Sequence, residues 1–157
     1  MLLYEVFPPE LIKIGLEAED KDEVFEELVD QFCQAEKSNA REDILEALWE
    51  RESKMSTGVK KGVAIPHAKT SAVGKTCGIL GISKKGIDYD ALDGKPVQLF
   101  FMFLAPNTDE EMCLQLLKNL AELLENPGLI EELLAQNDAG SANEIIRKYE
   151  SSGYAAE

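Results

Sequence analysis

The residue in this sequence best suited to chemistry is its single histidine, His67, which follows Val63-Ala64-Ile65-Pro66. The short apolar run predicts a buried strand that ends at Pro66, because proline cannot donate a hydrogen bond to a neighbouring strand. The restricted backbone of Pro66 would hold His67 in place and leave one ring nitrogen available as a nucleophile. Histidine titrates near neutral pH, but most histidines do no chemistry. Position alone therefore leaves a surface or packing role open.

The cysteines and the histidine together do not suggest a metal site. Cys33, Cys77 and Cys113 are odd in number, lie far apart in the sequence and form no Cys-x-x-Cys pair. A single histidine also argues against a histidine-rich metal site. We expect no metal, no cofactor and no disulfide framework, as is typical of proteins in a reducing cytoplasm. Cys33 and Cys77 lie within apolar patterns and are expected in the core.

A longer segment around His67 resembles a known family. The run Arg51-Glu-Ser-Lys-Met-Ser-Thr-Gly-Val-Lys-Lys-Gly-Val-Ala-Ile-Pro-His-Ala-Lys is similar to the phosphorylation-site segment of fructose/mannitol-type enzyme IIA domains. These domains belong to the phosphoenolpyruvate-dependent phosphotransferase system. The segment Asp88–Val97 and the helix that carries Leu116, Leu120 and Leu124 also resemble the family. A free-standing domain of this length most resembles the nitrogen-regulatory IIA branch.

The resemblance implies that His67 accepts a phosphoryl group from a phosphohistidine on an HPr-like carrier. His67 would then pass the group to a cysteine of a IIB domain, or hold it as a signal to a regulatory target protein. Arg51 matches the family's arginine and would offer a bidentate fork to the phosphoryl oxygens. Without the resemblance, Arg51 is a cation at a helix end. Thr57 and the Gly58 N–H would donate hydrogen bonds to the same group, or would serve an ordinary turn.

Two positions depart from the family pattern. Family members usually carry a second histidine at the start of the leucine-striped helix, and the corresponding position here is Cys113. A thiol is a weak hydrogen-bond donor and a thiolate would repel phosphate, so we expect Cys113 to line the pocket and to slow transfer. Lys60 stands where the family usually has glycine. Lys60 could be a solvated loop lysine, or with Lys61 and Lys69 it could form a local positive cluster that holds a phosphoryl group.

Helical spacing of apolar residues predicts the elements around this segment. The pattern Val24, Phe25, Leu28 and Val29 indicates an amphipathic helix over residues 21–36. A second helix is expected from Asn39, which would cap it together with Glu42. Three further helices are expected to begin at Thr108, Pro127 and Ser141.

Two longer apolar segments, Cys77–Ser83 and Val97–Ala105, predict sheet strands. The second is apolar on both faces and should be a central strand. Strands that alternate with helices indicate an α/β fold, which we expect to be a three-layer α/β/α sandwich with a mixed β-sheet flanked by helices. Residues 1–150 are expected to form a single IIA-like domain, with residues 151–157 as a frayed tail.

The charge balance limits the partners. With 30 acidic and 16 basic residues, the net charge is −14. Such a chain repels phosphate backbones and anionic lipids, which argues against nucleic acid and the membrane surface and favours a basic patch on a partner protein. The longest apolar run, Leu99–Pro106, is too short to cross a membrane. We read no signal peptide at the N-terminus and expect a cytoplasmic protein without membrane insertion.

Two functions fit these features. The first is a phosphoryl carrier that acts mainly in regulation, with His67 as the nucleophile. The alternative is a binding module, impaired in phosphotransfer, that controls a partner protein through the same docking face. A related cytoplasmic regulatory domain with no phosphoryl donor at all is a third reading.

Overall fold

The computed structural model describes residues 1–58 and 61–155, and within these residues five strands form one mixed sheet. The strand order is β1-β4-β5-β2, and β3 also pairs with β5. Strands β4 and β5 are antiparallel, whereas the pairs β1–β4, β2–β5 and β3–β5 are parallel. The strands are β1 (Ile12–Ile14), β2 (Val63–Ala64), β3 (His67–Lys69), β4 (Cys77–Ile87) and β5 (Val97–Ala105).

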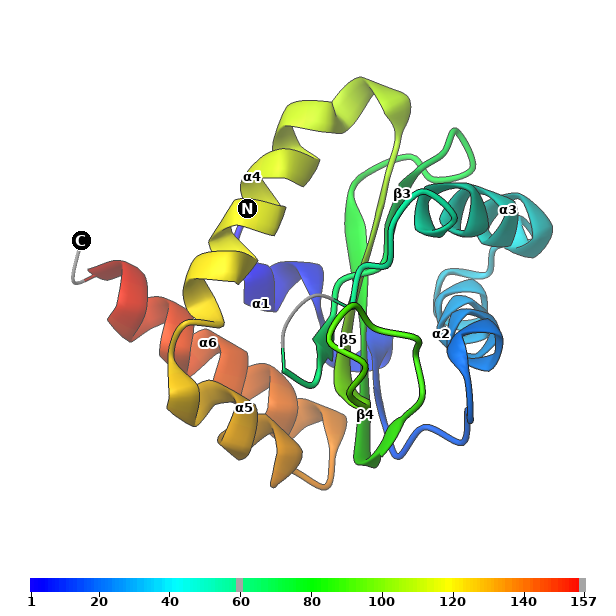
Figure 1. Ribbon diagram of the computed structural model, residues 1–157. Coiled ribbons are helices and arrows are strands. Elements are labelled where there is room, and N and C mark those ends of the chain that lie inside the picture. The colour runs from blue at the N-terminus through cyan, green and yellow to red at the C-terminus, as the bar shows by residue number, and fades with distance from the viewer. Residues whose placement is uncertain (59–60, 156–157) are drawn as a thin grey trace.

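Helices cover both faces of this sheet and make three layers (Figure 1). On one face lie α2 (Lys21–Glu36) and α3 (Arg41–Glu52). On the other face lie α1 (Leu3–Val6), α4 (Glu110–Leu123), α5 (Pro127–Leu134) and α6 (Ala139–Ala155). The predicted α/β/α sandwich is therefore confirmed. None of the helices in the described ranges is long and apolar enough to cross a membrane.

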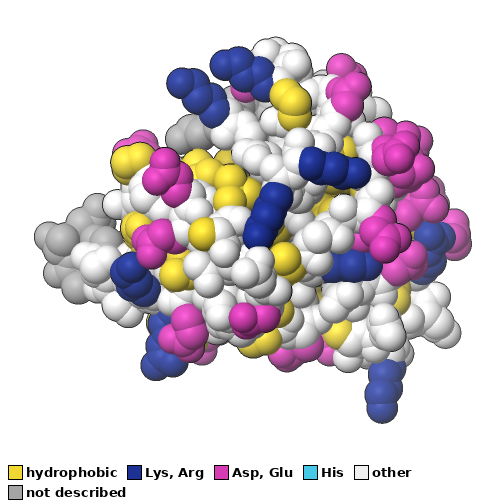
Figure 2. Space-filling model, turned by 90° about the horizontal axis from the view of Figure 1, so that it is seen from below, with side chains coloured by type: hydrophobic (Ala, Val, Ile, Leu, Met, Phe, Trp, Pro, Cys, Tyr) yellow, Lys and Arg dark blue, Asp and Glu magenta, His cyan; other side chains and the backbone are white. Residues whose placement is uncertain are grey.

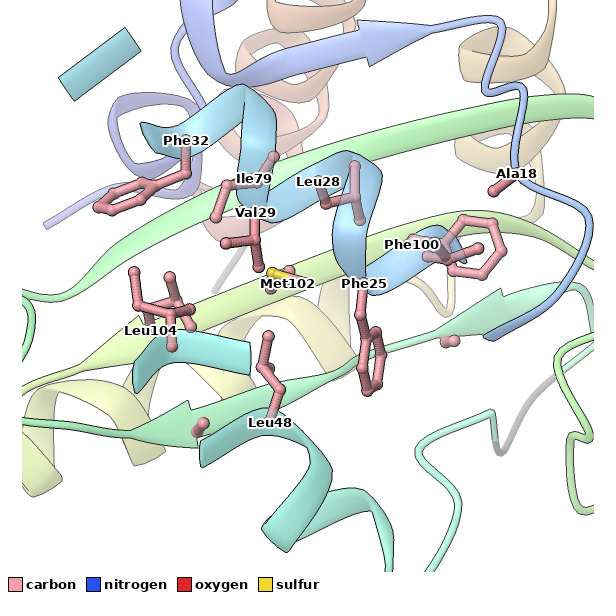
Figure 3. Close-up of a cluster of buried hydrophobic side chains, with 14 of the residues drawn as sticks. Ala18, Phe25, Leu28, Val29, Phe32, Leu48, Ile79, Phe100, Met102 and Leu104 are labelled. Atoms are coloured by element: carbon pink, nitrogen blue, oxygen red, sulfur yellow. The ribbon is translucent and has the colours of Figure 1, made fainter. Parts of the chain in front are cut away.

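Strand β5 is the centre of the sheet and contributes to two hydrophobic cores. Successive side chains of a strand point to opposite faces. Phe100, Met102 and Leu104 pack against α2 and α3 on one face (Figure 3). The residues between them, such as Phe101 and Phe103, pack against the helices of the other face. The continuous apolar run in β5 thus follows from burial on both sides, as predicted for a central strand.

Proline 66 divides what would otherwise be one edge strand. The predicted strand ends before Pro66, and β2 is even shorter than expected because the Ile65 N–H donates to the Thr57 carbonyl instead of to the sheet. Pairing with β5 resumes immediately at His67, which lies opposite Phe103. His67 is therefore held by the sheet itself, within β3, and not only by the proline before it.

Three of the predicted helix starts are wrong, since these helices begin at Arg41, Glu110 and Ala139. Asn39 does not cap α3, whose N-cap is Ala40 with no side-chain hydrogen bond. Thr108 lies in a short 3-10 turn, and α4 begins at Glu110. Asp109, at the N-cap of α4, uses its carboxylate to accept a hydrogen bond from Thr76 at 2.6 Å. The predictions for α2 and for the start of α5 at Pro127 are confirmed.

The last helix, α6, packs against α1, so the C-terminal and N-terminal segments of the chain are in contact. Helix α6 begins at Ala139, where Asp138 accepts a hydrogen bond from the Ser141 N–H, so Asp138 takes the capping role expected of Ser141. The helix continues to Ala155. It includes the first residues of the tail that we expected to be frayed, whereas residues 156–157 lie outside the described residues. Helix α1 and strand β1, which the sequence did not indicate, pack against α6 and β4 respectively.

Candidate functional site

A cleft of about 370 Å³ lies where α3, β3 and α4 meet. The C-terminal end of α3 supplies Arg51, β3 supplies His67, and the first turns of α4 supply Cys113. These three predicted site residues are separated by as many as 62 positions in the sequence (113 − 51), and the fold brings them to one cleft. The other charged side chains that line it are Glu50, Lys54, Lys69 and Glu110.

The ring of His67 is oriented by a backbone carbonyl. Its Nδ1 lies 2.8 Å from the Ile65 carbonyl oxygen. A carbonyl oxygen can only accept a hydrogen bond, so Nδ1 carries the proton and Nε2 keeps its lone pair. The ring is half-buried and lines the cleft. The local fold thus fixes both the tautomer and the direction of the nucleophilic nitrogen.

The surroundings of His67 keep its imidazole neutral. Burial lowers its pKa below the ordinary value of 6.5, and the nearby positive charges of Arg51 and Lys69 lower the pKa further. The hydrogen bond to Ile65 and the carboxylate of Glu52 act in the opposite direction but are outweighed. At neutral pH the ring is therefore uncharged and available as a nucleophile.

Arg51 combines a structural contact with a position in the cleft. Its Nη1 donates a hydrogen bond to the Met55 carbonyl at 2.9 Å, which ties the end of α3 to the loop that follows. A guanidinium has five N–H donors, so this single contact leaves donors for an anion. Arg51 thus acts as the helix-end cation of the simpler interpretation and also faces the site.

Cys113 lies in the wall of the cleft as a buried, uncharged thiol. It is 4% exposed, and burial raises its pKa above 9.0. Lys69 lowers that pKa, and the carboxylates of Asp109 and Glu110 raise it. A neutral thiol does not repel an anion, but it donates only a weak hydrogen bond. Of the two effects considered for this position, charge repulsion is absent and the loss of a good donor remains.

Thr57 and Gly58 are not among the residues that line the cleft. The Thr57 hydroxyl donates to Glu52 Oε1 at 2.7 Å, and the Thr57 N–H donates to Glu52 Oε2 at 2.8 Å. The hydroxyl of Tyr89 lies 3.0 Å from Thr57 Oγ1. Gly58 is buried against Tyr89 and Ala91, where an added Cβ would come within 2.8 Å of the Ala91 Cβ. Both residues therefore stabilise the loop that follows α3 without lining the cleft.

The expected positive cluster is divided by the fold. Lys69 lines the cleft, and its ammonium group pairs with Glu110. Lys61 lies elsewhere, beside hollows lined by Lys95 and other residues. Lys60 lies outside the described residues. Of the three lysines, Lys69 is the one that the described part of the structure places beside His67.

Two charged residues of this region were missed by the sequence analysis. Glu52 follows Ile44 and Leu48 at intervals of four, so helical spacing places it on the buried face of α3. A carboxylate on an apolar stripe is a signal that could have been found. Glu110 pairs with Lys69 across 41 positions of sequence, and no local pattern connects the two.

Comparison with known families agrees with this geometry. The family model described as "Phosphoenolpyruvate-dependent sugar phosphotransferase system, EIIA 2" matches residues 5–149. The chain belongs to this EIIA family. The match includes every residue of the cleft named above, so the predicted resemblance is confirmed over nearly the whole chain.

Individual EIIA proteins show the same relationship. The chain is 37% identical over 141 residues to the "PTS system fructose-specific EIIA component" of Haloferax volcanii, covering 90% of this chain and 92% of that protein. It is 35% identical over 150 residues to the "PTS system fructose-specific EIIABC component" of Bacillus subtilis, covering 96% of this chain. The chain spans only 24% of the length of that Bacillus relative.

A solved EIIA structure has the same fold. The nitrogen regulatory protein IIA-Ntr of Neisseria meningitidis superimposes with a TM-score of 0.83 at 31% identity, covering 92% of this chain and 98% of that one. The relatives of the chain thus include both fructose-specific and nitrogen regulatory EIIA proteins. They are consistent with a phosphoryl carrier that has a regulatory role.

Proposed function

We propose that His67 accepts a phosphoryl group on Nε2 and that the protein carries this group within a phosphotransferase system. The single observation that carries the proposal is the hydrogen bond from Nδ1 to the Ile65 carbonyl, which leaves Nε2 as the nucleophile in the cleft. Imidazole is a competent nucleophile near neutral pH, and the phosphoramidate that it forms is labile enough to be passed on.

The transfer step needs positioning and charge stabilisation more than covalent help from other residues. The Nε2 lone pair forms the new N–P bond while the N–P bond of the donor phosphohistidine breaks, and the donor nitrogen keeps that electron pair. Positive charge develops on the His67 ring, where the Nδ1–H bond to Ile65 stabilises it. Arg51 is the cation of the cleft placed to bind the phosphoryl oxygens.

The partners follow from this chemistry. The donor is an HPr-like phosphocarrier protein, and the receiver is a IIB domain or a regulatory target protein. A fused relative named as an EIIABC component supports a IIB domain, and nitrogen regulatory relatives support a regulatory target. We place the protein in the cytoplasm, where such donors act.

The proposal is tested by intact-mass spectrometry after incubation with phosphoenolpyruvate, enzyme I and HPr. We expect an acid-labile gain of one phosphoryl group on the wild type and no gain on His67→Ala. The matched control is Cys77→Ala, which removes a buried side chain away from the cleft. A wild type that gains no phosphate but still captures a regulatory protein would favour the binding module instead.

A further inference from the structure

Strand β3 presents a second functional side chain beside His67. Residues two apart in a strand point to the same side of the sheet, so Lys69 follows His67 on one face while Ala68 turns into the core. All three residues of β3 border the cleft, but Ala68 is only 5% exposed and packs in the core beneath it. The sheet therefore fixes the Cα of Lys69 relative to the nucleophile and leaves the long side chain free to move.

The ammonium group of Lys69 is held at the rim of the cleft by a single carboxylate. It pairs with Glu110 at the start of α4, and the two side chains are 46% and 58% exposed. An ion pair that exposed is weak, because water screens the attraction. Glu110 lies one helical turn before Cys113, so the ion pair lies against the wall that the thiol occupies.

The positive charge of Lys69 affects the pKa values of the side chains nearest to the reaction. After the larger effect of burial, Lys69 lowers the pKa of the imidazole of His67, and it also lowers the pKa of the Cys113 thiol. The described lining residues include two other cations, Arg51 and Lys54, and Arg51 already donates to Met55. A phosphoryl group brings between one and two negative charges and three acceptor oxygens, which makes it a stronger partner for an ammonium than one carboxylate.

We propose that Lys69 leaves Glu110 and binds the phosphoryl group when His67 is phosphorylated. In this charge exchange, the ammonium group of Lys69 exchanges one anionic partner, the Glu110 carboxylate, for another, the phosphoryl group. This inference rests on the proposed phosphorylation of His67. Lys69 keeps its proton throughout and forms no covalent bond, and the bonds that form and break are those of the transfer step above. Lys69 supplies the donor that the buried Cys113 thiol lacks, and Glu110 competes with the phosphoryl group for it.

The proposal predicts opposite effects for the two partners. Lys69→Gln slows phosphoryl acceptance by about tenfold, since a donor to the developing charge is lost. Glu110→Gln speeds acceptance about twofold to fivefold, because Lys69 then has no ion pair with Glu110 to break before it binds the phosphoryl group. Glu110→Gln adds nothing in a protein that already carries Lys69→Gln, because Glu110 acts through Lys69. Lys69→Arg restores most of the rate.

The test measures initial rates of phosphorylation by phosphoenolpyruvate, enzyme I and HPr for the two single variants, the double variant and Lys69→Arg. Glu111→Gln and Lys118→Gln are matched controls, since both residues are exposed on α4 and neither lines the cleft. Phosphorus NMR of the phosphorylated proteins gives a second readout. The phosphohistidine signal is expected to shift in Lys69→Gln and to stay in place in both controls.

The outcomes separate the two proposals. If the wild type gains phosphate at His67 but Lys69→Gln reacts at the wild-type rate, the charge exchange is wrong and the carrier function stands. If Glu110→Gln speeds the reaction equally with and without Lys69, the effect is a general one of surface charge and the exchange is again wrong. If the wild type gains no phosphate, or if His67→Ala gains as much, the carrier function fails and the exchange fails with it.

Discussion

At the scale of single residues, the cleft combines a well-placed nucleophile with a weak neighbour. His67 has its tautomer set by the Ile65 carbonyl, and Arg51 lies in the same cleft. Cys113, where the sequence resemblance led us to expect a second histidine, contributes a buried neutral thiol to the wall of the cleft. A neutral thiol would neither repel the phosphoryl group of the proposed carrier nor stabilise it well, so the proposed site lacks one strong donor.

Replacing Cys113 by histidine is expected to speed phosphoryl acceptance. An imidazole N–H in the cleft wall would donate to the phosphoryl oxygens in the transition state, and a donor of this kind is worth about tenfold to a hundredfold in rate. The measurement is the initial rate of mass gain with phosphoenolpyruvate, enzyme I and HPr. Cys113→Ala, which adds no donor, should react at nearly the wild-type rate. Equal rates for Cys113→His and Cys113→Ala would show that this position does not contact the phosphoryl group.

The protonation of His67 can be followed directly because it is the only histidine. Its ring proton resonance should titrate with a pKa below 6.5, since burial and then Arg51 disfavour the charged form. The neutral ring is the nucleophile, so acceptance should be constant from pH 8 to about 6.5 and fall only as the pH drops through the lower folded pKa.

Arg51→Gln removes one positive charge near the ring and should raise the pKa of His67 towards its ordinary value. Lys118→Gln, which removes a lysine outside the cleft, should leave the titration unchanged. A wild-type pKa at or above 6.5 would contradict the interpretation that the site keeps His67 neutral.

At the scale of elements, a buried carboxylate holds the loop behind the site. Glu52, at the end of α3, is 5% exposed and accepts hydrogen bonds from the hydroxyl and the N–H of Thr57. Lys21, at the start of α2, pairs with Glu52 at 2.9 Å and lies over the Tyr89 ring. This group joins two helices and two loops, and it fixes the end of α3 from which Arg51 projects.

Glu52→Ala is expected to lower the free energy of unfolding by about 3 kcal/mol, because the Lys21 ammonium and the Thr57 N–H lose their buried acceptor. The single tryptophan, Trp49, packs against Phe25 in a tilted arrangement with ring centroids 5.0 Å apart, so its fluorescence reports urea unfolding. Glu46→Ala, at an exposed position of the same helix, should change the free energy by less than about 0.5 kcal/mol. A loss for Glu52→Ala as small as that of the control would contradict the role of this network.

At the scale of the whole molecule, contacts between the two ends of the chain close one layer of the fold. Glu150 in α6 accepts hydrogen bonds from the Leu3 and Tyr4 N–H groups at 2.6 and 2.8 Å. Asn143 donates to the carbonyls of Tyr4 and Phe7. The first turn of α1 thus receives its acceptor from a residue about 147 positions away, and α1 cannot be stable without α6.

Glu150→Ala should therefore lower the free energy of unfolding by about 2 kcal/mol, since two backbone N–H groups lose a charged acceptor. Hydrogen exchange of the Leu3 and Tyr4 amides should become faster in the same variant. Glu144→Ala, exposed on the same helix, is the control and should leave both measurements unchanged. Unchanged exchange at Leu3 in Glu150→Ala would show that α1 does not depend on this contact.

The charge of the molecule is also distributed unevenly. Acidic side chains gather at the right of Figure 2, on the side of the molecule where α2 lies. The cleft, in contrast, is lined by three cations, Arg51, Lys54 and Lys69, and by two carboxylates, within a chain of net charge −14. A local positive site on an acidic protein favours an anionic group at that point while the surrounding surface attracts a basic partner.

Much of the architecture could be predicted because it depends on periodicity. Helix α2 and strand β5 were predicted with their observed ends, since apolar spacing and burial on both faces are properties of local sequence. The helix starts at Asn39, Thr108 and Ser141 were wrong because a capping residue type does not by itself specify where a helix begins. Helices α3 and α4 have no side-chain cap, the Asp109 carboxylate accepts from Thr76 instead, and Asp138 rather than Ser141 caps α6. Helix α1 and strand β1 were missed since each is too short to show a pattern.

By itself, the sequence was enough to determine the family and the layered fold, and it predicted His67 as the nucleophile. The unique histidine lies after Pro66 within a specific motif, and apolar residues recur with a regular period over long segments. Both features can be recognised from local sequence, without knowledge of contacts between distant residues. The tertiary structure alone decided which polar groups share the cleft. It turned Thr57 towards Glu52, separated Lys61 from His67 and placed Glu110 against Lys69. Side-chain partners depend on the path of the chain through space, because hydrogen bonds and ion pairs act over a few ångströms whatever the separation in sequence.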